Sequence, residues 1–110
     1  MNHLGFTAVN FITCEIDYQE RFEELFKNRA GLIDNNPGFR NMQVLKPSKN
    51  GDQYLIVSNW DSENYFINWT KSKSFIEGHK RGFSDIKKAI DEGKNPPMKS
   101  DFKTYSIISN

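Results

Sequence analysis

The sequence has only one cysteine, Cys14, so no disulfide can form within the chain. A lone cysteine fits a reducing compartment, and we expect a cytoplasmic protein in which Cys14 is a small apolar side chain. Net charge is nearly absent too, because 15 basic and 14 acidic side chains leave +1 at pH 7. This balance indicates neither nucleic acid nor an anionic membrane surface as a partner.

Long hydrophobic runs are also missing. No apolar stretch approaches the roughly 20 residues of a membrane-spanning helix, and the first residues lack a basic-then-apolar signal pattern. The sequence contains no zinc-ligand spacing, nucleotide-binding glycine pattern or catalytic triad. A length of 110 residues suits one modest core, so we expect a single domain over residues 1–110.

Aromatic side chains are what the sequence has in abundance, with nine Phe, four Tyr and two Trp. They supply a large apolar area from few residues, which serves a compact core equally well as a flat-ligand pocket with a subunit interface. Composition alone leaves both interpretations open.

The first half of the chain predicts a strand, a helix and a hairpin. Residues 6–16 are β-branched and aromatic, as in a strand. Asp17 and Glu20 form a candidate capping box that opens a helix, whose apolar stripe continues to Ile33. That helix should stop before Pro37. Strands over 39–46 and 53–60 then flank an Asn-Gly pair, which is typical of a hairpin.

The second half predicts two short helices, a further helical piece and a last strand. Asp61 or Ser62 caps the first helix, and Ser72 or Ser74 caps the second. Residues 83–92 form another amphipathic piece, and residues 102–109 a strand. The order β-α-β-β-α-β predicts an α+β, ferredoxin-like split βαβ fold with an antiparallel sheet.

Both faces of this sheet are expected to be apolar. On residues 6–16 and 53–60, both sets of alternating positions carry large apolar side chains, and 102–109 has Phe102 and Ile108 alternating with Tyr105 and Ile107. The helices can cover only one face, so we predict a homodimer that packs sheet against sheet.

Three residues carry candidate chemistry. His79 could ligate a metal or be an exposed helix-end histidine, and Trp69 could press on a flat cofactor or be a core aromatic. Asn10 is an amide in an apolar strand, which costs free energy unless its hydrogen bonds are satisfied by a ligand or by backbone. Together they suggest a metalloporphyrin pocket.

Several motifs resemble the antibiotic biosynthesis monooxygenase superfamily of dimeric α/β barrels. They are Phe26-Lys-Asn-Arg29, Asn36-Pro-Gly-Phe39, Val57-Ser-Asn-Trp60-Asp-Ser, Phe66-Ile-Asn-Trp69 and Lys71-Ser-Lys-Ser-Phe75-Ile-Glu-Gly-His79. Within it, the chain is most similar to heme-degrading monooxygenases of the bacterial heme-iron acquisition type, because Asn10, Trp69 and His79 stand at that group's characteristic positions. The helical segment after His79 departs from the pattern.

The resemblance implies an enzyme for which heme is both substrate and cofactor. His79 would be the axial iron ligand, Trp69 would press the macrocycle out of plane, and Asn10 would hydrogen-bond the oxygen species or water at the iron. Heme would also contact Phe26, Arg29 and Phe75, with Arg29 either pairing with a propionate or simply solvated. An external electron donor and dioxygen would drive ring opening and iron release.

Two other functions remain open from the sequence. Other branches of the superfamily act without a cofactor on quinol-like or polyketide aromatic substrates, and the same apolar pocket would serve them. The chain could also be a non-enzymatic dimer that binds heme or another small ligand.

Overall fold

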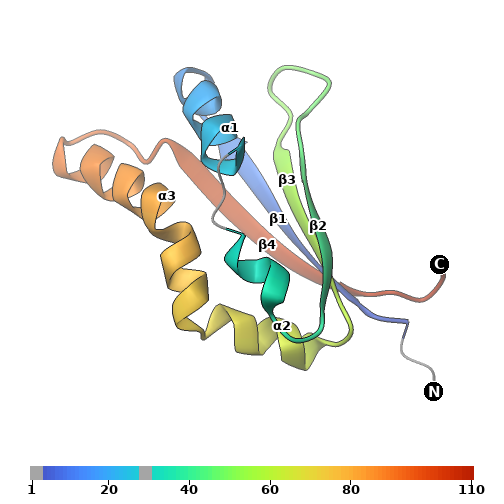
Figure 1. Cartoon of the computed structure of the whole chain (residues 1–110). Coiled ribbons are helices and arrows are strands. Elements are labelled where there is room, and N and C mark those ends of the chain that lie inside the picture. Colours follow the sequence, from blue (N-terminus) through green and yellow to red (C-terminus); the bar gives the residue numbers. More distant parts are fainter. Residues whose placement is uncertain (1–3, 28–30) are drawn as a thin grey trace.

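The computed structural model describes residues 4–27 and 31–110 and contains one antiparallel sheet of four strands. The strands are β1 (Phe6–Cys14), β2 (Phe39–Leu45), β3 (Tyr54–Trp60) and β4 (Met98–Ser106), in the spatial order β2-β3-β1-β4. Helices α1 (Gln19–Lys27), α2 (Glu63–Thr70) and α3 (Lys73–Asp91) accompany it (Figure 1). This confirms the predicted ferredoxin-like α+β fold.

The helices cover the face of the sheet formed by the even-numbered residues of β1 and β3. One core cluster joins Phe6, Ala8 and Trp60 to Trp69 of α2. A second cluster joins Ile12 and Tyr54 to Phe22 of α1, and it lies nearer the other end of the strands. Since side chains alternate along a strand, the odd-numbered residues of β1 and β3 face away from the helices.

The first helical region differs from the prediction. Asp17 lies inside a short 3-10 helix (Ile16–Tyr18) and is not the N-cap, so the expected capping box does not form. The continuous helix to Ile33 is also wrong, because Gly31 has a φ of 70° and a second 3-10 helix (Leu32–Asn35) follows it. A left-handed residue cannot lie within a continuous α-helix, so the helix does not run unbroken to Ile33.

The region after Trp69 also needs correction. The two helical pieces predicted around His79 and over 83–92 are one helix of 19 residues, α3. Ser72 is its N-cap, and the Ser72 side chain accepts a hydrogen bond from the Phe75 amide at 3.1 Å. At the other end the helix stops at the C-cap Glu92, and Gly93, with a φ of 76°, turns the chain away.

The last strand begins at Met98, four residues earlier than predicted, and ends at Ser106. Ile107 and Ile108, which were expected to alternate within it, lie beyond its end. Of the β4 residues, all but Met98 are exposed, and the rings of Phe102 and Tyr105 are each about half exposed. β4 is therefore an edge strand whose side chains are largely uncovered.

The face opposite the helices is apolar at its centre. Val9 and Val57 are paired across β1 and β3, and Phe11 and Leu55 form the next pair on the same face. Exposed Leu45 lies opposite Leu55 on β2. Within residues 4–27 and 31–110, no helix is long and apolar enough to cross a membrane.

Candidate functional site

A cavity of about 690 Å³ lies between the helices and the covered face of the sheet. Its size falls within the roughly 300–1,000 Å³ typical of small-molecule sites. The walls are mostly apolar, with Ile56, Phe66 and Met98 among the lining side chains. A few polar groups interrupt this surface, which is the pattern expected of a pocket that orients a largely apolar ligand.

Five of the six residues predicted for the site line this cavity. They come from four elements, with Asn10 on β1, Phe26 on α1, Trp69 on α2, and Phe75 and His79 on α3. The fold thus brings together side chains up to 69 positions apart in the sequence. The sixth residue, Arg29, lies outside the described residues.

His79 is held by its own helix. Its Nδ1 lies 2.6 Å from the carbonyl oxygen of Phe75, one turn earlier. A carbonyl only accepts, so Nδ1 carries the proton, and in the neutral ring Nε2 keeps the lone pair that can bind a metal. The imidazole also lies between two rings, 4.1 Å from the Phe75 centroid and 5.6 Å from that of Phe83. Both its tautomer and its orientation are therefore constrained.

Trp69 belongs to the core and to the cavity wall at once. It is 5% exposed and packs with Phe6, Ala8 and Trp60. Phe75 meets the indole edge to face, with centroids 5.7 Å apart and an interplanar angle of 78°. The two interpretations of Trp69 from the sequence are therefore compatible, because buried packing fixes a ring that lines the cavity.

Asn10 is hydrogen-bonded through a side chain that the sequence analysis did not single out. The hydroxyl of Ser100 on β4 donates to Asn10 Oδ1 at 2.6 Å. Ser100 also lines the cavity. It was missed because the last strand was expected to begin only at Phe102. Once β4 begins at Met98, the register Asn10↔Phe102 brings Ser100 next to Asn10.

Further lining residues were also missed, among them Phe66, Phe102, Gly78 and Gly82. Phe66 of α2 stacks on Phe102 of β4, with centroids 5.4 Å apart and planes only 14° apart. Gly78 and Gly82 line the cavity from α3, where a Cβ added at Gly78 would meet no atom within 4 Å. Gly78 therefore leaves open space beside His79, whereas a Cβ added at Gly82 would lie 3.5 Å from the Met98 side chain.

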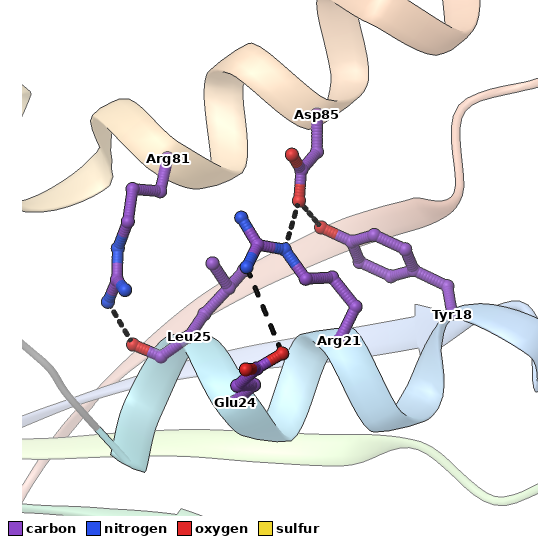
Figure 2. Close-up of polar contacts among 6 residues, drawn as sticks. All are labelled: Tyr18, Arg21, Glu24, Leu25, Arg81 and Asp85. Carbon is purple, nitrogen blue, oxygen red and sulfur yellow. Dashed lines mark hydrogen bonds and ion pairs between the residues drawn. The ribbon is translucent and has the colours of Figure 1, made fainter.

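Polar contacts fasten α3 to the α1 region beside the cavity (Figure 2). Asp85 Oδ2 accepts from Arg21 Nε at 3.0 Å and from the Tyr18 hydroxyl at 2.7 Å. One turn earlier on α3, Arg81 Nη2 donates to the carbonyl of Leu25 at 2.7 Å. We call this group of five residues the α1–α3 clasp.

The clasp shifts the ionisation of its members. Burial disfavours the charged form of Asp85, but the hydrogen bonds from Arg21 and Tyr18 outweigh it, so the carboxyl pKa lies below its ordinary value. Burial and the bond to Asp85 raise the pKa of Tyr18. Asp85 is therefore ionised, and Tyr18 protonated, across the neutral range.

Within residues 4–27 and 31–110, no group of three or more His, Cys, Asp or Glu side chains could hold a metal ion. Burial, followed by the nearby Glu15, raises the pKa of Cys14 to about 11. A thiol with such a pKa is protonated at neutral pH and is a poor nucleophile or ligand.

Comparison with known proteins identifies a family and relatives to which the sequence is similar. Residues 5–81 match the family described as antibiotic biosynthesis monooxygenase. A mycobilin-producing heme oxygenase from Mycobacterium tuberculosis (strain ATCC 25618 / H37Rv) is 30% identical over 74 residues, which are 66% of this chain and 70% of the relative.

Two solved structures have similar folds. The heme-degrader MhuD from Mycobacterium tuberculosis, with two hemes bound in its active site, aligns with a TM-score of 0.68 and 22% identity over 96% of this chain and 97% of its own. SnoaB from Streptomyces nogalater, a cofactor-independent oxygenase, aligns with a TM-score of 0.68 and 17% identity over 96% and 95%. One fold thus accompanies two chemistries.

Proposed function

This chain belongs to the antibiotic biosynthesis monooxygenase family, and we propose that it is a heme-degrading monooxygenase, with heme as substrate and cofactor. The observation that carries the proposal is the lining of one apolar cavity by Asn10, Trp69 and His79. The 30% identity to a relative named as a heme oxygenase supports it. The roles below are parts of the proposal.

The residues present fit a metalloporphyrin. His79 would hold the heme iron through Nε2, because its Nδ1–H is engaged by the Phe75 carbonyl and Nε2 carries the lone pair. A ligating histidine commonly donates its other ring N–H to a carboxylate, a carbonyl or water in this way. The apolar walls suit the faces of a macrocycle, and the indole of Trp69 is packed too tightly to yield easily to a flat ligand.

Each of the other side chains has a defined part. Trp69 would contact the macrocycle from α2, and Phe26 and Phe75 would help to exclude water from it. Asn10 presents a hydrogen-bond donor, because its carbonyl oxygen already accepts from Ser100 and its NH2 group is the end left to donate. Arg29 is the proposed partner of a propionate.

Bound heme supplies the oxygen chemistry, with dioxygen and an external electron donor as co-reactants, and the products are an opened tetrapyrrole and free iron. The protein's contribution is to hold the ring, shape it and orient a donor beside it. A cytoplasmic location, consistent with the single cysteine, is part of the same proposal.

The proposal includes a homodimer. The face of the sheet opposite the helices is apolar around Val9, Val57 and Phe11, and β4 adds to that face the half-exposed Tyr105, which is paired with Thr7. An apolar sheet face needs cover, and a second copy of the chain supplies it symmetrically.

Hemin titration tests the ligand. The protein should bind hemin stoichiometrically with a sharp Soret band, and His79→Ala should weaken binding by at least roughly tenfold and broaden the band. His3→Ala is the matched control, since His3 is the only other histidine, and it should bind as the wild type does. Equal binding by His79→Ala and wild type would remove His79 as ligand.

Turnover is the second stage of the test. With ascorbate under air, the Soret band of the complex should decay while a ferrous-iron chelator reports one iron per heme. A complex whose band persists for hours would be a heme-binding protein and not a degrading enzyme. Absence of a tight hemin complex would favour the second candidate, a cofactor-independent oxygenase acting on an aromatic substrate, which the likeness to SnoaB supports at the level of fold.

A further inference from the structure

We infer that Ser100 is a positioning residue, whose hydroxyl holds the carboxamide of Asn10 by its oxygen and so aims the NH2 group into the cavity. The inference deepens the proposed function and rests on it. Ser100 needs no contact with the heme for this role, because it acts through Asn10.

The register between β1 and β4 brings the side chains of Asn10 and Ser100 together. Asn10 lies opposite Phe102 on the antiparallel β1–β4 ladder, and Ile12 lies opposite Ser100. Asn10 and Ser100 are thus diagonal neighbours on the helix-covered face, a separation that side chains of their length can span. The hydrogen bond of 2.6 Å between Ser100 Oγ and Asn10 Oδ1 closes this diagonal.

The two residues directly opposite Asn10 cannot hold its amide. Ile56 lies opposite it on β3 and has no hydrogen-bonding side-chain group. Phe102 lies opposite it on β4, and that ring is stacked on Phe66. An asparagine amide rotates easily about its terminal torsion, so a single bond decides how it is aimed. Ser100 is the residue that makes this bond.

The chemistry of the amide explains why its direction matters. A carboxamide has an acceptor end and a donor end, and only the donor end can support a ligand that is accepting a hydrogen bond. Without the hydroxyl of Ser100, the amide can turn its oxygen to the cavity or to water. A donor that must be reoriented for each turnover contributes less than one already in place.

A double-mutant cycle on the full chain tests the inference. Ser100→Ala should lower the rate of heme ring opening roughly two- to tenfold, the range expected for one neutral hydrogen bond. In the Asn10→Ala background, the same change should have no further effect. Ser100→Thr, which keeps the hydroxyl, should restore the rate. Thr104→Ala is the matched control, because it removes a hydroxyl from the same face of β4, opposite Ala8, and should leave the rate unchanged.

A second readout does not depend on heme. In the ligand-free protein, the side-chain amide resonance of Asn10, assigned by its loss in Asn10→Ala, should shift in Ser100→Ala and return in Ser100→Thr. The melting temperatures of these variants should agree with that of the wild type within the spread set by Thr104→Ala.

The outcomes separate the two proposals. The inference about Ser100 would be overturned if Ser100→Ala lowered the rate as much in the Asn10→Ala variant as in the wild type. It would also be overturned if Ser100→Ala alone left the rate unchanged. If the wild type does not degrade heme, the proposed function fails, and the resonance then decides the matter for Ser100. A shift that Ser100→Thr reverses would keep Ser100 as the residue that holds Asn10, whereas an unmoved resonance would overturn it.

Discussion

The α1–α3 clasp offers the sharpest test of how this structure is held together. In Asp85→Asn, the carboxylate that accepts from Tyr18 at 2.7 Å and Arg21 at 3.0 Å becomes a neutral amide. The Asp85 side chain is 24% exposed and that of Arg21 is 42% exposed, so solvent screens the ion pair. We assign about 1 kcal/mol to the Tyr18 bond and no further stabilisation to the exposed Arg21 pair.

A loss of about 1 kcal/mol should lower the melting temperature by about 4 °C in a domain of this size. Differential scanning calorimetry at pH 7 measures it. Asp91→Asn is the control, since Asp91 lies on the same helix in an exposed pair with Lys87 and should change stability by only a few tenths of a kcal/mol. Asp85→Asn should also weaken hemin binding, because α3 carries His79.

The pH dependence of the stability tests whether the ionised form of Asp85 makes this contribution. The pKa of Asp85 is lower in the folded than in the unfolded chain, so its stabilisation is complete above the ordinary Asp value of about 3.9 and disappears as pH falls below it. The gap between wild type and Asp85→Asn should therefore be full at pH 7 and should narrow as the pH falls below about 3.9. A gap that is absent at pH 7, or that does not change down to pH 3, would refute this account of the clasp.

Three further predictions concern the cavity, the core and the outer face. Gly78→Leu should keep the melting temperature but weaken hemin binding, because the added side chain meets open space within the cavity lining; unaltered binding in a Soret titration would contradict this. Burial and the bond to Glu23 raise the pKa of Tyr54 to about 12, so the stabilisation of about 1 kcal/mol that Tyr54→Phe removes should be complete below the ordinary Tyr value of about 10 and should be lost as the pH rises from there through about 12, which urea unfolding at several pH values measures. Val57→Asp, at the centre of the outer face, should convert the proposed dimer to a monomer in light scattering, with exposed Asp52→Asn as control; a wild type that is already a monomer at micromolar concentration would end the dimer proposal.

The order and type of the elements could be read from local patterns. Alternation marked residues 6–16, 39–46 and 53–60 as strands, and the structure confirms each within two residues. The predicted boundaries of the first helix were wrong at both ends, because one local pattern pointed to a continuous helix and another interrupted it. Asp17 and Glu20 had capping-box spacing, but the chain turns through a 3-10 helix before α1. Gly31 interrupts a stripe whose apolar spacing continues past it.

The length of α3 and the first residue of β4 depend on contacts with segments that are distant in the sequence. The stretch around Gly78 and Gly82 has weak helix propensity, which favoured two separate pieces. In the structure, Gly82 lies close to Met98 of β4 and Leu25 of α1, so packing supports a continuous helix there. The segment 98–101 is polar and resembles a loop, yet it pairs along its length with β1. Pairing with a neighbouring strand can stabilise strand geometry in residues whose intrinsic strand propensity is low.

For the site, the sequence alone determined the chemical types, namely an imidazole, an indole and an amide at spacings that matched a family. It also determined that Phe75 and His79 share a helix face, because that follows from a spacing of four. Tertiary structure decided everything that depends on separation in the chain. It decided that Asn10, on a strand, lines the same cavity as His79, 69 residues later. It decided that Ser100, 90 residues away, bonds the amide, because strand register is a property of pairing and not of either strand alone.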